Sequence, residues 1–106
     1  MSTARAKYTF VVLIDDHTDA DALSRRMNNR QAHLAEATRR RQAGIMVSGG
    51  AILDSHEQRK MVGSSLIIRA ESEQQVLELL RTDPYTVGGA WNLDTVRIYP
   101  YVEAEF

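Results

Sequence analysis

Three histidines are the side chains of this chain best suited to exchange protons near neutral pH: His17, His33 and His56. His17 and His56 lie in polar segments that predict loops. Together with His33 they lack the spacing typical of a zinc site, so we expect no metal. His33 lies in a segment of helical periodicity beside Leu34, on the rim of a predicted apolar stripe. A histidine there either faces a cleft or is a satisfied structural residue.

Arginines in the same predicted helix raise a similar pair of alternatives. Arg30 projects close to the apolar stripe, so it must snorkel, form an ion pair or line a wet pocket. It would suit a bidentate contact with a substrate carboxylate, or equally a structural pair with a nearby carboxylate. The basic run 39–41 comes late in the helix, where cations suit the negative end of the dipole. We interpret this run as a solvated helix end rather than a phosphate site.

Composition excludes several classes of protein. The 106 residues predict one domain over 1–106 with its core at about 8–101. The 13 Lys and Arg nearly balance the 14 Asp and Glu, so the net charge does not favour binding to nucleic acid or to an anionic membrane. The absence of cysteine excludes disulfides and thiolate catalysis. Gly49 and Gly50 lack the Lys and Ser/Thr of a phosphate-binding loop, so we expect no nucleotide, flavin or other cofactor.

The expected location in the cell follows from two features of the sequence, its polar first residues and its short apolar runs. Met1 to Lys7 are polar and do not form the apolar core of a signal peptide. No apolar run approaches the ~20 residues that span a bilayer. We therefore expect a cytoplasmic protein without membrane attachment.

The first half of the sequence predicts a strand followed by the long helix that carries His33. Residues 8–14 are apolar on both pleat faces, which predicts a central strand. A long helix is expected from about Asp19 or Asp21 to Ala43, with Leu23, Met27 and Leu34 on its buried stripe. Cap chemistry from the aspartates and the stop at Gly44 support these bounds.

The second half of the sequence repeats the pattern of strand and helix. Paired glycines in the strand at 45–53 indicate a bulge or a close backbone approach. A polar hairpin loop at 54–60 precedes the third strand, 61–70. A capping-box pattern, Ser72 with Gln75, opens a second helix that Pro84 ends. The last strand is expected from about Trp91 to Tyr101.

The resulting β-α-β-β-α-β order predicts an α+β, ferredoxin-like fold, with an antiparallel sheet and both helices on one of its faces. The other sheet face would carry too much aromatic and aliphatic surface to stay exposed. We therefore expect a homodimer built sheet to sheet, a dimeric α+β barrel, with a cleft near the uncovered edge of each sheet.

Five short segments occur in order along the chain: the Arg-x-x-His-Leu of 30–34, Gly44 with 48–50, Gly63-Ser64, Asp83-Pro84-Tyr85 with 88–90, and Tyr99-Pro100-Tyr101. Together they resemble the YciI-like (YCII-related) family, and the similarity extends from Tyr8 to Tyr101. The second segment reads Ser-Gly-Gly at 48–50, where the family commonly has Ala-Gly-Pro.

The resemblance implies a dimeric ferredoxin-like fold and an active site built on His33 and Asp83. Ser64 would lie between them as a polar contact. Some relatives resemble muconolactone isomerases and dehydrohalogenases, which move protons on small acids or halogenated rings without a cofactor. An aspartate bonded to one ring nitrogen would orient the imidazole and leave the other nitrogen free to take a proton.

The remaining expected substrate contacts are Arg30, Tyr85 and Trp91. The two aromatics would form walls of an apolar pocket, or alternatively belong to the core or the dimer interface. The first hypothesis is therefore a cofactor-independent acid–base enzyme for a small organic acid or ring compound. The alternative is a non-catalytic ligand-binding or accessory module, in which His33 and Asp83 form a structural hydrogen bond. A third reading, with His33 as a heme ligand, has no other support in the sequence.

Overall fold

The structure, a computed structural model, describes residues 6–106, so residues 1–5 of the polar leading segment considered above lie outside the described part. The order of its main elements is the β-α-β-β-α-β order predicted from the sequence. The elements are β1 (Tyr8–Asp15), α1 (Ala22–Gln42), β2 (Met46–Leu53), β3 (Met61–Ala70), α2 (Glu73–Arg81), the short α3 (Pro84–Val87), the 3-10 turn η1 (Leu93–Thr95) and β4 (Arg97–Tyr101).

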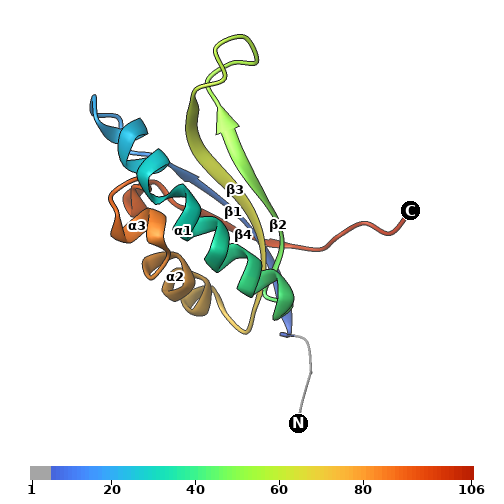
Figure 1. Ribbon diagram of the computed structural model, residues 1–106. Coiled ribbons are helices and arrows are strands. Elements are labelled where there is room, and N and C mark those ends of the chain that lie inside the picture. Colours follow the sequence, from blue (N-terminus) through green and yellow to red (C-terminus); the bar gives the residue numbers. More distant parts are fainter. Residues whose placement is uncertain (1–5) are drawn as a thin grey trace.

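The four strands form one antiparallel sheet in the order β2-β3-β1-β4. Strand β1 is central, as its two apolar faces predicted. All three helices lie on one side of the sheet, and the other side carries none of them (Figure 1). The ferredoxin-like arrangement of sheet and helices is therefore confirmed.

The core lies between the sheet and the helices. Alternate residues of β1 and β3 are buried there, as expected where successive side chains of a strand point to opposite faces of the sheet. Their partners in α2 are Val76 and Leu80, both fully buried. The buried apolar residues of the two central strands are Phe10, Val12, Ile14, Leu66, Ile68 and Ala70.

The buried face of α1 differs from the prediction. Leu23, Met27 and Leu34 were expected in the core, but their side chains are 36%, 51% and 44% exposed. The buried residues of α1 are instead Ala22, Arg26, His33 and Arg40. The last three recur every seven residues, so they share one helix face. That face is polar, and other elements supply a hydrogen-bonding partner for each of its side chains.

The predicted N-terminal cap is confirmed for α2 but not for α1. The Ser72 hydroxyl accepts a hydrogen bond from the Gln75 N–H at 3.1 Å, as the capping pattern predicted. Asp21 occupies the N-cap of α1 but makes no side-chain cap bond. Asp19 instead pairs with Arg25 at 2.6 Å.

The approach to the last strand also differs from the prediction. The strand was expected from Trp91, but β4 begins at Arg97. Trp91 is buried and forms only an isolated bridge with Asp16. The intervening residues form η1, whose N-cap Asn92 accepts a hydrogen bond from the Asp94 N–H. Asn and Asp favour this local bonding over a strand ladder, which explains the late start.

In β2 the irregularities of the register with β3 do not fall at the glycine pair. The register shifts between Met46 and Ser48 and again between Ile52 and Leu53, on either side of the glycine pair. Gly49 provides the close approach that was expected, because a Cβ there would lie 2.9 Å from Leu66 Cδ2. Strand β2 can therefore pair closely with β3 beside the site described below.

Candidate active site

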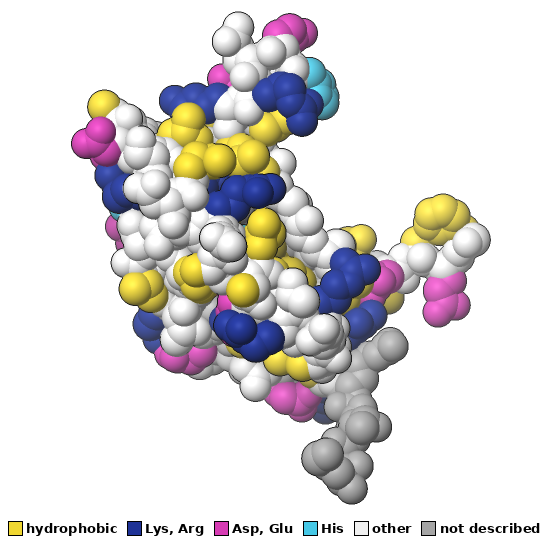
Figure 2. Space-filling model, in the orientation of Figure 1, with side chains coloured by type: hydrophobic (Ala, Val, Ile, Leu, Met, Phe, Trp, Pro, Cys, Tyr) yellow, Lys and Arg dark blue, Asp and Glu magenta, His cyan; other side chains and the backbone are white. Residues whose placement is uncertain are grey.

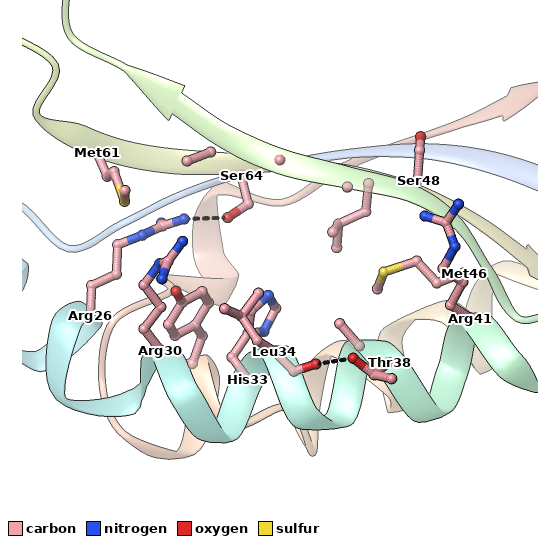
Figure 3. A pocket seen from close by; sticks show the side chains of 16 residues that line it. Arg26, Arg30, His33, Leu34, Thr38, Arg41, Met46, Ser48, Met61 and Ser64 are labelled. Carbon is pink, nitrogen blue, oxygen red and sulfur yellow. Dashed lines mark hydrogen bonds between the residues drawn. The ribbon is translucent and has the colours of Figure 1, made fainter.

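A cavity of about 510 Å³ lies between α1 and the β2–β3 hairpin, on the helix side of edge strand β2. Side chains of α1 enter it from one side and those of β2 and β3 border the other (Figure 3). On the face shown in Figure 2, basic and hydrophobic side chains lie together in this region. The residues that line the cavity are Arg26, Arg30, His33, Leu34, Ala37, Thr38, Arg41, Met46, Ser48, Gly49, Gly50, Ala51, Met61, Ser64, Leu66 and Tyr85.

The structure brings His33 and Asp83 together. Nδ1 of His33 lies 2.8 Å from Oδ1 of Asp83, and both side chains are buried. Asp83 is held in place by its position as N-cap of α3, where the same Oδ1 accepts the Tyr85 N–H at 2.9 Å. Pro84 favours this geometry because its fixed φ suits the first helical position. Pro84 thus starts α3, in addition to following the end of α2.

Asp83 also pairs with Arg40, which in turn contacts Glu36. Arg40 Nη1 lies 3.4 Å from Asp83 Oδ2, and its Nη2 donates to the Leu79 carbonyl at 3.0 Å. Arg40 Nε lies 3.2 Å from Glu36. The interpretation of the basic run as a solvated helix end is therefore wrong for Arg40, which is buried to compensate Asp83. Without such a cation, a buried carboxylate is costly.

The His33 ring is fixed by aromatic neighbours. The Tyr85 ring stacks on it at a centroid distance of 3.9 Å and an interplanar angle of 13°. Trp91 meets it edge-on at 5.3 Å. Since Nδ1 is bonded to Asp83 and one face is covered, Nε2 is the polar atom of the ring that remains for a molecule in the cavity. Burial raises the pKa of Tyr85, so its hydroxyl stays neutral at ordinary pH.

Ser64 has both acceptor positions occupied. Its Oγ accepts from Arg26 Nη2 at 3.0 Å and from Trp91 Nε1 at 3.0 Å. A hydroxyl offers two lone pairs and one proton, so the remaining capacity of Ser64 is as a donor. Because Ser64 lines the cavity, that proton is available to an oxygen of a bound molecule.

Arg26 and Asp16 form a buried ion pair that the sequence analysis missed. Arg26 Nη1 donates to the two carboxylate oxygens of Asp16 at 2.8 and 3.1 Å, and both side chains are buried. Arg26 also lies over the Tyr85 ring, 4.7 Å from its centroid. Burial raises the pKa of Asp16, while Arg26 acts in the opposite direction. The sequence signal was the seven-residue spacing of Arg26, His33 and Arg40.

The cavity is cationic. Its described lining holds Arg26, Arg30 and Arg41 but no Asp or Glu. Arg30 lines the cavity and makes no side-chain hydrogen bond or ion pair with any residue in 6–106, so the structural pair with a carboxylate is not formed within this range. Trp91 is not among the lining residues and reaches the site through its bond to Ser64. An anion entering this cavity would meet no fixed negative charge on its walls.

Two further observations concern ligands and membranes. Within residues 6–106 no group of three or more His, Cys, Asp or Glu side chains is placed to hold a metal ion. In the same range no helix combines the length and the apolar character needed to cross a membrane.

The chain is similar in sequence to fungal biosynthesis proteins. The chain is 40% identical over 78 residues to the "derivative of benzaldehyde biosynthesis cluster protein C" of Emericella nidulans, covering 69% of this chain and 80% of that protein. It is 30% identical over 96 residues to fusaric acid biosynthesis protein 2 of Gibberella fujikuroi, covering 87% and 90%. Both similarities extend over most of each protein.

A solved structure is also similar. It is that of 5-chloro-2-hydroxyhydroquinone dehydrochlorinase from Burkholderia phenoliruptrix AC1100, in complex with 2,5-dihydroxybenzoquinone. The TM-score is 0.75 at 25% identity, with 91% of this chain and 95% of that chain covered. The model of the YCII-related domain matches residues 9–101. This chain belongs to the YCII-related domain family.

Proposed function

We propose that this protein is a cofactor-independent enzyme that performs acid–base chemistry on a small hydroxylated ring compound or organic acid. The observation that carries the proposal is the His33–Asp83 hydrogen bond of 2.8 Å at the wall of a cationic cavity. Asp83 holds the ring with Nδ1–H toward itself, so Nε2 serves as the base. The similarity to a dehydrochlorinase supports the same class of chemistry.

The proposed step starts with Nε2 of His33 taking a proton from a hydroxyl or an acidic carbon of the substrate. The electron pair of the broken bond stays on the substrate. In an elimination this pair forms a new double bond and expels a leaving anion such as chloride, so that HCl is lost overall. In an isomerisation the imidazolium returns the proton to another substrate atom. Asp83 stabilises the imidazolium while it exists.

Charge that develops on a substrate oxygen would be stabilised by Ser64 and Arg30. The Ser64 hydroxyl is restricted to donation by Arg26 and Trp91, so it is preorganised for an oxyanion. Arg30 lines the cavity and has no competing partner in the described chain, so it is available to an anionic substrate. Tyr85 forms the apolar wall.

We also propose that the molecule is a homodimer that pairs through the open sheet face. Val11 lies between Tyr99 of β4 and Ile67 of β3 in the ladder, which makes a row of large apolar side chains across that face. The helices lie on the other side of the sheet (Figure 1). A second copy would cover this row sheet to sheet.

The enzyme proposal is tested by assaying the purified protein with hydroxylated and halogenated ring compounds, including 5-chloro-2-hydroxyhydroquinone, and following chloride release and absorbance. Turnover is expected for the wild type. His33→Gln and Asp83→Asn should lower kcat by about 10²–10⁴-fold, the usual contribution of a positioned base. His17→Gln is the matched control, because His17 is exposed and outside the cavity.

Two outcomes would count against the proposal. Unimpaired turnover in His33→Gln would remove His33 as the base. Saturable binding without turnover of any compound, combined with a stability loss of about 1–3 kcal/mol in His33→Gln, would favour the ligand-binding or accessory module instead.

A further inference from the structure

Three consecutive arginines near the end of α1 have three different surroundings. Arg39 pairs with Glu36 and is exposed. Arg40 is buried against Asp83 and the Leu79 carbonyl. The Arg41 side chain makes no hydrogen bond or ion pair with residues 6–106, yet it lines the cavity. Figure 3 shows its guanidinium group extending from α1 toward the strands, at the Met46 end of the cavity.

Arg41 lies at the end of the cavity away from Arg30 and Ser64, and His33 lies between the two ends (Figure 3). Arg41 follows His33 by eight residues, which corresponds to about 12 Å along a helix axis. Arg26, Arg30, Ser64 and Met61 lie at the other end in the same view (Figure 3).

The wall between the two ends is mainly apolar. Leu34 and Ala37 line it from α1, and Met46 and Leu66 line it from the sheet. Gly49 contributes bare backbone there, because a side chain at that position would meet Leu66. The Ser48 hydroxyl points away from the cavity (Figure 3). A ligand long enough to fill the cavity would therefore pass an apolar middle before it reaches Arg41.

We infer that Arg41 forms a second anion subsite, which binds an acidic group on the substrate far from the reacting atoms. The inference rests on the proposed function, since it places the reacting atoms at His33. An arginine fork matches a carboxylate in two parallel hydrogen bonds. No carboxylate in the described lining competes for it. The substrate class is a hydroxylated ring that carries a carboxylate on an apolar spacer.

The test uses binding and needs no turnover. The probes are 4-hydroxyphenylalkanoates of increasing chain length, together with the corresponding carboxamides, titrated calorimetrically into the full chain. At the chain length that spans the cavity, the acid should bind about tenfold more tightly than its amide, the effect expected of one charge-assisted contact. The preference should shrink as salt is added, because the subsite is open to solvent.

Variants assign the effect to one side chain. Arg41→Gln should abolish the preference for acid over amide and leave the affinity for the amide unchanged. Arg39→Gln is the matched control: it removes the same charge from the neighbouring position, but Arg39 does not line the cavity and should keep the preference. Both residues are exposed, so neither variant should impair folding.

Several results would overturn the inference. These are equal binding of acid and amide by the wild type at every chain length, no saturable binding of any acid, or loss of the preference in Arg30→Gln but not in Arg41→Gln. An equal loss in Arg39→Gln would show a general field effect in place of a subsite. If the activity assay shows turnover but the titrations show no preference for acid over amide, the subsite alone is refuted. If the titrations show the preference but the activity assay shows no turnover, the enzyme proposal is refuted and the subsite stands.

Discussion

At the scale of single residues, the site depends on how the hydrogen-bonding capacity of each side chain is used. His33 uses Nδ1 toward Asp83 and keeps Nε2. Ser64 receives two donors and keeps its proton. Under the proposed function, these two residues would present one base and one donor to the cavity, which are the two groups that proton transfer to and from an oxygen-bearing ring requires.

Ser64 allows a stability prediction with a neighbouring control. Ser64→Ala leaves Arg26 Nη2 and Trp91 Nε1 without this acceptor in a buried place, so the free energy of unfolding should fall by about 1–3 kcal/mol. Ser65→Ala, on the opposite face of β3, should change it by less than about 0.5 kcal/mol. Urea denaturation measures both, and equal losses would contradict the hydrogen-bonding role.

At the scale of elements, α1 carries the site on a face that is both buried and polar. Arg26, His33 and Arg40 recur every seven residues, and their partners lie just after β1, on β3 and in the segment that joins α2 to α3. Each partner fixes the helix against a different element. The helix is thus positioned largely by ion pairs and hydrogen bonds, while Leu23, Met27 and Leu34 remain exposed.

The sequence predicted the central strand correctly but not the buried face of α1, because that face is polar. Strand β1 was predicted correctly because a short run that is apolar on both pleat faces is typical of a central strand. For α1 the helical periodicity of apolar residues selected Leu23, Met27 and Leu34, and this periodicity takes no account of buried polar side chains. The partners of Arg26 and Arg40 could not be assigned, because Asp83 follows Arg40 by 43 residues and only the fold joins them. Family resemblance supplied the pairing of His33 with Asp83.

The buried pair of Arg26 and Asp16 predicts an unusual pH dependence for a variant. Burial already raises the pKa of Asp16, and Arg26→Met would remove the charge that opposes this rise. A group with a raised folded-state pKa contributes stability that is present below its unfolded-state pKa and lost as the pH rises through the folded-state value. Arg26→Met should therefore lose more stability relative to wild type at pH 8 than at pH 5, reaching about 3–5 kcal/mol.

Arg25→Met is the control for this experiment. Arg25 also pairs with an aspartate ahead of α1, but Asp19 is exposed and stays hydrated when its partner is removed. Denaturant unfolding of both variants at the two pH values measures the difference. A pH-independent loss in Arg26→Met would mean that Asp16 does not titrate as a buried carboxyl.

At the scale of the whole molecule, the sheet has one covered face and one open face (Figure 1). The open face carries the row of Tyr99, Val11 and Ile67 across three neighbouring strands. The same sheet carries Ser64 on its covered face, so a dimer through the open face leaves the cavity of each copy accessible.

Val11→Asp tests the proposed dimer. The charge should convert a wild-type dimer into a monomer in sedimentation velocity, because it would be buried without a partner in the sheet-to-sheet contact. Val87→Asp, at a side chain 77% exposed on α3, should leave the dimer intact. Circular dichroism verifies that both variants keep the fold. A wild type that sediments as a monomer at micromolar concentration would contradict the dimer.

The central claim, that His33 presents a free Nε2 to the cavity because Asp83 binds its Nδ1–H, is tested most directly by the ¹⁵N NMR spectrum of the His33 ring in the neutral state. The account predicts the tautomer with the proton on Nδ1 in the wild type, and loss of this preference in Asp83→Ala. A wild-type ring with its proton on Nε2 would contradict it, because no basic nitrogen would then face the cavity.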